Sequence, residues 1–261
     1  MTSPAAVTDA TPAVAPTEYL LRLADDRLVL GHRLSEWCGH APILEEDIAL
    51  ANVALDLVGH ATALLTLAAR REGQGRTEDD LAFLRDAREF RNVHLVELPR
   101  GDFAFTIVRQ FLFDAYGLHV YDALQRSADA ELAAIAAKTH KEVRYHVRHS
   151  GEWMLRLGDG TAESHDRMQA ALDELWHFTG ELWATDALDA ELLAAGIAPD
   201  MAALQGAWRE QVAEVIAAAT LMLPADRSPM RDGRRGIHTE YLGHMLAEMQ
   251  SVARAHPGAT W

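Results

Sequence analysis

The apolar residues of this chain form long runs with helical spacing, separated by short stretches rich in glycine, proline and aspartate. The most apolar run extends from Ile43 to Ala69 and contains no lysine, arginine or glutamate after Asp47. Within it Asn52, Asp56 and His60 recur every four residues, which places them on one stripe of a helix. The rest of the circumference is apolar, so we predict a buried helix with Asp56 inside the protein.

Similar runs predict three more long helices, and short breaks join the four into two antiparallel hairpins. A crossing segment of about 30 residues connects the hairpins. This is the connectivity of a ferritin-like four-helix bundle, so we predict an all-α protein built on that bundle. The four helices are expected over 18–37, 43–72, 102–127 and 129–157.

Outside the bundle, the pattern predicts outer helices and one disordered end. We expect a single helical domain over 17–261, with a bundle core at about 18–157 and outer helices within about 164–256. Residues 1–16 are rich in alanine, threonine and proline, and lack the basic start and apolar core of a signal peptide, so they predict a disordered tail. The outer helices are expected at about 164–195, 200–222 and 239–256.

Composition narrows the class of protein. The 261 residues carry a formal net charge of −15, which disfavours nonspecific nucleic-acid binding. The single cysteine, Cys38, excludes an internal disulfide, favours a cytoplasmic protein and is expected to be a small buried residue. The run over 48–69 approaches the length of a membrane span, but Asp56 at its middle would cost roughly 3 kcal/mol in a bilayer. We therefore expect no membrane insertion.

The candidate chemistry lies in four acids, one on each predicted bundle helix. In a ferritin-like di-iron protein, two helices each supply one glutamate and the other two each supply a Glu-x-x-His motif. The acid positions occur here in the expected order, with aspartate replacing glutamate at two of them. They are Glu36, Asp56, Asp114 and Glu142.

The two histidine positions of that pattern hold other residues. Gly59 and Tyr145 stand where the ligands should be, and His60 and His146 follow one residue later. Position i+3 lies about −60° around a helix from residue i, whereas i+4 lies about +40°. The two histidines therefore flank their acids on the side opposite to a working ligand.

Two interpretations of these residues remain open. In the first, neighbouring polar side chains neutralise the acids within a satisfied core network. In the second, Asp56 with His60 and Glu142 with His146 hold two iron ions. The first is favoured because two metals close together need correctly placed ligands from both helices at once. The neighbours considered for the network are His60, His146, Tyr145, Arg109 and Lys138.

Three stretches, Arg33–Gly59, Lys141–Thr161 and Gly236–Gln250, resemble the C subunits of bacterial phenylacetyl-CoA 1,2-epoxidases, which are ring-hydroxylating monooxygenases. The resemblance extends over nearly everything after about residue 17. It implies a ferritin-like, non-catalytic structural subunit that pairs with a di-iron catalytic A subunit and supports it in phenylacetate degradation. The residues at 59 and 145 agree with the loss of a working metal set.

The resemblance also implies the rest of the system. A small B subunit and a reductase carrying an iron–sulfur centre and FAD, and using NADPH, would complete the complex. This chain would then hold no catalytic, cofactor-binding or metal-binding residue, and no cofactor. Expressed alone, it is expected to form a homodimer, the commonest closed assembly. A standalone ligand-binding bundle without partners is a third hypothesis.

One basic cluster lies in a predicted polar loop over 224–236. Its guanidinium groups suit contact with the phosphates of CoA or with an acidic partner surface. The alternative is an ordinary solvated loop. The cluster consists of Arg227, Arg231, Arg234 and Arg235.

Overall fold

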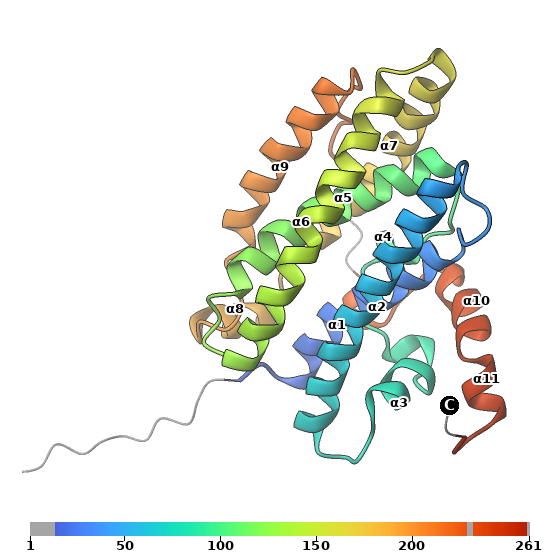
Figure 1. The fold of residues 1–261 in the computed structure, drawn as a ribbon. Coiled ribbons are helices and arrows are strands. Elements are labelled where there is room, and N and C mark those ends of the chain that lie inside the picture. Colours follow the sequence, from blue (N-terminus) through green and yellow to red (C-terminus); the bar gives the residue numbers. More distant parts are fainter. Residues whose placement is uncertain (1–13, 229–231, 260–261) are drawn as a thin grey trace, which may run out of the picture.

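The computed structural model describes residues 14–228 and 232–259, and all regular structure within these ranges is helical. The predicted all-α, ferritin-like architecture is confirmed, and Figure 1 shows the long helices side by side. Short breaks join α1 to α2 and α5 to α6, so each pair forms an antiparallel hairpin. The four bundle helices are α1 (Thr17–Ser35), α2 (Leu44–Glu72), α5 (Phe103–Leu124) and α6 (Ala130–Gly158).

The α1–α2 hairpin packs closely because a glycine faces the neighbouring helix. A Cβ atom at Gly31 would lie 3.1 Å from Cγ2 of Val58 and 3.3 Å from the carbonyl oxygen of Ala54. Larger side chains at this point would push the two helices apart. The sequence therefore sets the distance between the last turns of α1 and the middle of α2.

The segment that crosses between the hairpins is anchored on buried acids of α1. Asp25 accepts hydrogen bonds from the Arg85 guanidinium and from the backbone N–H of Arg91. Asp26 accepts one from the backbone N–H of Val93 at 2.9 Å. These bonds fix the path of an otherwise irregular connection, whose helical pieces are α3 (Glu78–Phe83), η1 (Ala87–Glu89) and α4 (His94–Glu97).

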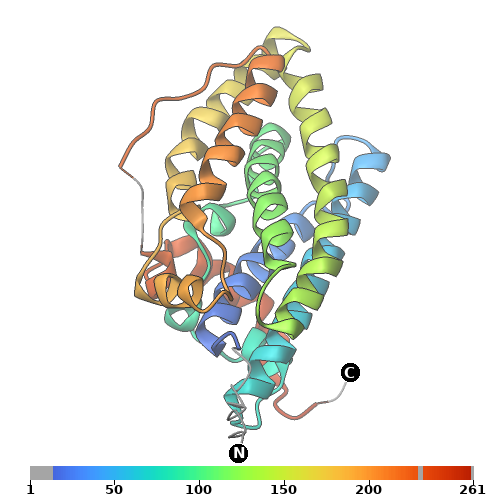
Figure 2. The same cartoon turned by 90° about the vertical axis from the view of Figure 1, so that its left-hand side faces the viewer.

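Two of the outer helices, α7 and α9, cover one side of the bundle by packing against α5 and α6 (Figure 2). The continuous helix predicted over 164–195 is wrong: it breaks after Leu182. Asp186 then caps a new helix by accepting from the backbone N–H groups of Leu188 and Asp189. The outer elements are α7 (Ala162–Leu182), α8 (Ala187–Ala194), α9 (Met201–Ala218), η2 (Gly233–Arg235), α10 (Glu240–Met249) and α11 (Ser251–Ala255).

The α2 helix is less buried than its composition predicts. By length and apolar composition alone, α2 could cross a membrane, but a packed core helix meets the same two criteria. It lies along α1, yet Leu44 and Leu55 are 72% and 70% exposed. The Asp56 side chain keeps 38% of its surface exposed, so the prediction that it lies inside the protein is wrong.

The structure also corrects two smaller predictions, the burial of Cys38 and the start of the packed chain. Cys38 is exposed just after α1 rather than buried, because it follows the end of the helix at Ser35. Residues 1–13 of the predicted tail lie outside the described residues. Within the remainder, Ala15 is fully buried, and its backbone N–H donates to Asp129 at 2.7 Å. The packed part of the chain therefore includes residues before the predicted start at 17.

Candidate functional site

Two imidazole–carboxylate pairs join α2 and α6 near the middle of the bundle. Nε2 of His60 lies 2.5 Å from a carboxylate oxygen of Glu142, and Nε2 of His146 lies 2.9 Å from one of Asp56. The two imidazole ring centroids are 6.3 Å apart. Because α2 and α6 run antiparallel, the acid of each helix meets the histidine of the other. The predicted neighbours thus come together, but across the helices rather than along them.

Burial determines the charge states of the His60–Glu142 pair. Removal from water, reinforced by the nearby Arg27 cation, lowers the pKa of His60 to about 2. A neutral His60 donates its Nε2–H to Glu142, while its buried Nδ1 has no hydrogen-bond partner among the described residues. Burial and the adjacent Asp56 carboxylate raise the pKa of Glu142. The pair therefore exists as a neutral donor and a carboxylate acceptor.

Asp114 contributes a third acid from α5. Its side chain is fully buried and accepts hydrogen bonds from Nε2 of Gln110 at 2.7 Å and from Oγ of Ser150 at 3.0 Å. Burial raises the pKa of Asp114 to about 6 despite these bonds and the nearby His146. Both carboxylate oxygens are thus occupied by donors from the protein itself.

The fourth predicted acid does not join the cluster. Glu36 follows the end of α1, is exposed, and pairs with Arg33 at 2.7 Å. The expectation of a mid-helix acid from α1 is therefore wrong. Instead, α1 contributes Arg27, whose guanidinium carbon lies 4.6 Å and 4.7 Å from the ring centroids of Phe113 and Tyr121. A cation thus stands inside the bundle where an acid was expected.

The residues at the two missing histidine positions point away from the interior. Tyr145 is 46% exposed, and its ring stacks on that of His149 with centroids 6.3 Å apart. Gly59 is exposed, and a Cβ atom there would meet no described atom within 4 Å. Substituting these positions alone would therefore not direct a ligand into the bundle.

The residues present do not fit a di-iron centre. Among the described residues, no group of three or more histidine, cysteine, aspartate or glutamate side chains is placed to hold a metal ion. Nε2 of each central imidazole is already paired with a carboxylate. The buried Arg27 adds a positive charge close to His60 and Asp114, which would oppose the binding of further cations.

A second buried polar cluster, which the sequence pattern did not reveal, joins α4 to the outer helices. His94 pairs with Glu181 of α7 at 2.8 Å, and His238 pairs with Glu97 at 2.8 Å. Although burial opposes it, the hydrogen bond to Glu181 raises the pKa of His94. The members lie far apart in sequence, so periodicity carried no signal for this cluster. Its contacts attach the crossing segment to α7 and to the chain before α10.

The predicted arginine cluster is divided among different environments. Arg234 is mostly buried and pairs with Asp26 at 2.8 Å; although burial opposes it, that carboxylate raises the pKa of Arg234. Arg235 is exposed beside Asp232, and Arg227 is exposed. Arg231 lies outside the described residues. Arg234 is therefore a structural residue rather than a free cation.

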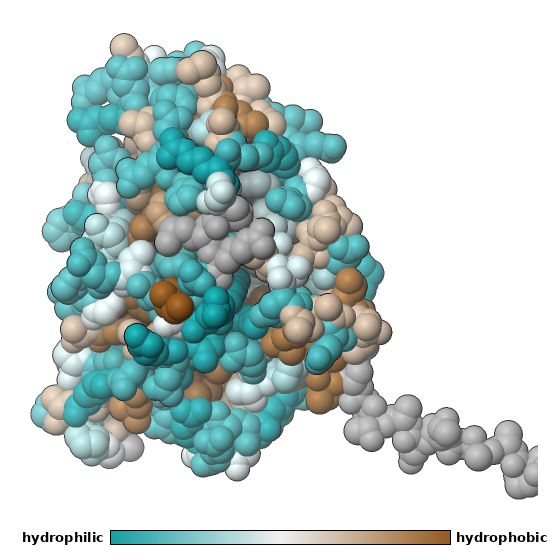
Figure 3. Space-filling model, turned by 180° about the vertical axis from the view of Figure 1, so that it is seen from behind, coloured by the Kyte–Doolittle hydropathy of each residue, from teal (hydrophilic) through white to brown (hydrophobic). Residues whose placement is uncertain are grey.

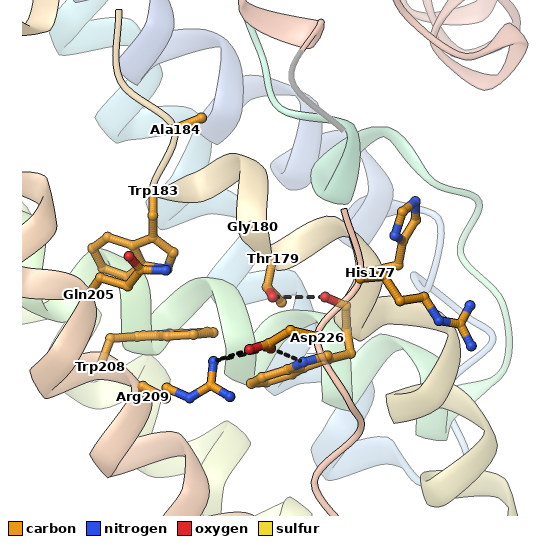
Figure 4. Close-up of a pocket in the computed structure, with 11 residues that line it drawn as sticks. His177, Thr179, Gly180, Trp183, Ala184, Gln205, Trp208, Arg209 and Asp226 are labelled. Atoms are coloured by element: carbon orange, nitrogen blue, oxygen red, sulfur yellow. Dashed lines mark hydrogen bonds and ion pairs between the residues drawn. The ribbon is translucent and has the colours of Figure 1, made fainter. Parts of the chain in front are cut away.

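Arg227 lies at a pocket of about 240 Å³ formed by α7, α9 and the following loop (Figure 4). The pocket is lined by the tryptophan trio, Trp176, Trp183 and Trp208. Nε1 of Trp176 donates to Asp226 at 3.0 Å, and Arg209 pairs with the same carboxylate. These contacts hold the loop against the outer helices, and the indoles fill the space between them.

Comparison with known proteins identifies a family and a close relative. Residues 1–261 match the family described as "Phenylacetic acid catabolic protein". The chain is 50% identical over 245 residues to the C subunit of the 1,2-phenylacetyl-CoA epoxidase of Escherichia coli (strain K12). The alignment covers 94% of this chain and 98% of that relative.

Proposed function

Since the chain belongs to the phenylacetic acid catabolic protein family and acts in phenylacetate catabolism, we propose that it is a non-catalytic structural subunit of a phenylacetyl-CoA 1,2-epoxidase. It would pair with a ferritin-like, di-iron A subunit and support that subunit's structure. The support for this proposal comes from the relative's name and from the interior of the bundle.

The observation that carries the proposal is the replacement of metal ligands by internal hydrogen bonds. His60 and His146 are bound to Glu142 and Asp56, and Arg27 supplies a cation beside them. Such a network stabilises the helix contacts without any metal. The chain can thus keep the shape of the fold while leaving the oxidative chemistry to a partner.

The proposed system contains further components. The catalytic A subunit would hold the di-iron centre, and a small B subunit would join the complex. A reductase with iron–sulfur and FAD groups would deliver electrons from NADPH. We place the assembly in the cytoplasm, consistent with a chain whose single cysteine allows no internal disulfide.

The alternative di-iron oxygenase has less support. It requires Asp56 and His60 to act together from α2, and Glu142 and His146 from α6. In the structure each acid instead bonds to the histidine of the opposite helix. Bringing the pairs onto metal ions would require breaking both hydrogen bonds and placing cations near Arg27.

The deciding experiment measures iron and turnover separately. The chain is expressed in iron-supplemented medium, alone and together with the A subunit, and iron is quantified in each purified sample. We expect the isolated chain to hold far less than one iron per chain and to show no oxygen-dependent turnover, and the A subunit to co-purify with it. About two iron ions per isolated chain, the content of a di-iron bundle, would overturn the proposal.

A further inference from the structure

The α2 helix presents one continuous exposed face, which we call the α2 stripe. Its members are three or four residues apart, so they lie on one side of the helix. Leu44, Ile48 and Leu55 are 72%, 54% and 70% exposed. Exposed apolar side chains aligned along one face of a helix are a feature of interaction surfaces. The α2 stripe comprises Leu44, Ile48, Asn52, Leu55, Gly59, Thr62, Thr66 and Arg70.

By contrast, the face of the molecule seen in Figure 3 is mostly hydrophilic, with apolar residues scattered over it. That view is from behind Figure 1, in which α2 runs along the near side beside α6. The aligned leucines and isoleucine of α2 therefore set its face apart from this opposite one.

The two halves of the α2 stripe differ in size. Large side chains occupy its first half, and Gly59, Thr62 and Thr66 occupy its second half. The threonine hydroxyls donate to carbonyl oxygens of their own helix at 2.9 Å and 2.8 Å, so they are already satisfied. The small side chains of this second half, with no described atom within 4 Å of a Cβ at 59, stand lower than those of the first half and form what we call the trough. Large groups from an antiparallel copy would fit it.

The ends of the α2 stripe carry opposite charges. Glu45 is exposed at the first turn of α2. Arg70, in the last turn, is 61% exposed while it contacts Glu131 of α6. When two such helices pack antiparallel, the acidic end of each lies near the basic end of the other. This arrangement is electrostatically favourable, whereas a parallel one would bring like charges together.

The face of α6 beside the α2 stripe also carries exposed charges of opposite sign. The pairs His60–Glu142 and Asp56–His146 place the middle of α2, at position 57, level with Tyr145 of α6. Lys138 and Glu152 are exposed on α6, two helical turns before and after Tyr145. A two-fold axis at this level would bring Lys138 of one copy opposite Glu152 of the other.

We propose that the α2 stripe is the surface through which two copies of this chain associate, antiparallel, about a two-fold axis at the level of position 57 and Tyr145. Leu55 of each copy fits over Gly59 of the other, and Tyr145 meets its own equivalent at the axis. The contact is isologous, because the same patch supplies both the large groups and the trough. This inference concerns the isolated chain and does not depend on its metal content.

The test uses the full chain expressed alone and the variant Gly59→Arg, studied by sedimentation at micromolar concentrations. Wild type is expected to be a dimer, and Gly59→Arg to weaken the dimer at least tenfold. Arginine favours helix over glycine, and the monomer has open space at 59, so helix content should be retained. A monomeric wild type, or a dimer that Gly59→Arg leaves intact, would overturn the proposal.

Matched controls separate the register from a general effect of charge. Gly206 of α9 is also exposed with open space at its Cβ, so Gly206→Arg should leave the dimer intact. Lys138→Glu should weaken the dimer, and adding Glu152→Lys should restore it. Failure of the double exchange to restore association would contradict the proposed two-fold register, as would loss of the dimer in Gly206→Arg.

Discussion

The guanidinium of Arg27 lies directly against the backbone of Gly117: a Cβ atom at position 117 would be 2.5 Å from Nη2. The Arg27 side chain is 1% exposed and lies between the rings of Phe113 and Tyr121, so it has little room to move. The cation from α1 enters the bundle only because α5 has no side chain at this point. Glycine at 117 and arginine at 27 therefore form one structural unit.

Substituting Gly117 by alanine should destabilise the protein. In an open helix interior this change stabilises by about 0.5–1 kcal/mol. Here the methyl group overlaps the confined guanidinium of Arg27, so we expect a net loss of about 1–3 kcal/mol, typical of overpacking. Urea unfolding of wild type and variant measures the free energy. Gly206→Ala, at an open position on α9, should stabilise and serves as the control.

The pairing of Arg27 with Gly117 is tested by a double-mutant cycle. Arg27→Met removes the group that the new methyl would meet, so Gly117→Ala should cost much less in that background. We expect a coupling free energy above about 1 kcal/mol, as for residues in direct contact. Additive effects of the two substitutions would show that the alanine is harmful for another reason.

Asp114 should make stability fall as pH rises. Its folded pKa is about 6, above the unfolded value of about 4, so the native state binds the extra proton between these values. Stability therefore decreases from about pH 4 to about pH 6 and then levels off. Asp114→Asn removes this dependence and should stabilise by about 1–2 kcal/mol at pH 7, with no gain at pH 4.

Urea titrations between pH 4 and pH 8 check this expectation. The asparagine amide can donate to Ser150, whose hydroxyl lies 2.9 Å from the carbonyl oxygen of His146 and can turn toward it. The hydrogen bond from Gln110 can remain. An equal difference between variant and wild type at every pH would contradict the raised pKa of Asp114.

The periodicity of the chain was sufficient to predict the bundle, because each long helix has its own apolar pattern and clear breaks. It could not show which side of α2 is covered, since Leu55 is as apolar as any core residue and only its neighbours decide its exposure. It placed Glu36 inside a helix that in fact ends one residue earlier. The exchange of histidine partners between α2 and α6 also depended on how the two helices meet.

The sequence pattern does not single out Arg27, because it follows Asp25 and Asp26 and three successive charged residues are typical of an exposed turn of helix. In the structure the three residues point to different buried partners. Asp25 and Asp26 hold the crossing segment, whereas Arg27 reaches α5. Local charge pattern gives no information about such distant partners, which only the tertiary packing provides.

Within the arginine loop, substitutions at Arg234 and Arg227 should have very different effects. Arg234→Met leaves the buried Asp26 without its cation, which typically costs about 3–5 kcal/mol. Arg227→Met changes an exposed side chain and should alter stability by less than about 0.5 kcal/mol. Chemical denaturation of both variants measures the contrast. Adding Asp26→Asn to Arg234→Met should recover part of the lost stability. Equal losses of stability at 227 and 234 would refute the distinction between a structural Arg234 and an exposed Arg227.

Asp129 should contribute stability that is lost in acid. It caps α6, accepts from the backbone of Ala15 and pairs with Arg71, and despite burial these contacts lower its pKa to about 2. Its stabilising effect is therefore complete above the unfolded value of about 4 and is lost as pH falls toward 2. Asp129→Asn should cost about 1–2 kcal/mol at pH 7 and less at pH 3.

Thermal unfolding at these two pH values provides the comparison. An asparagine at this position would remain able to cap α6, so the helix itself should persist. Asp129→Ala, which removes the cap as well, should cost more at both pH values. A penalty for Asp129→Asn that stays constant between pH 7 and pH 3 would argue against the depressed pKa.

The tryptophan trio provides a natural optical reporter. The Trp208 ring centroid lies 5.7 Å from that of Trp176 and 5.5 Å from that of Trp183, so excitation absorbed by one of these rings can pass to the others. Three of the six tryptophans thus emit from a single place, the contact between α7 and α9. Intrinsic fluorescence should consequently follow the opening of this outer layer, while circular dichroism follows the helices of the whole molecule.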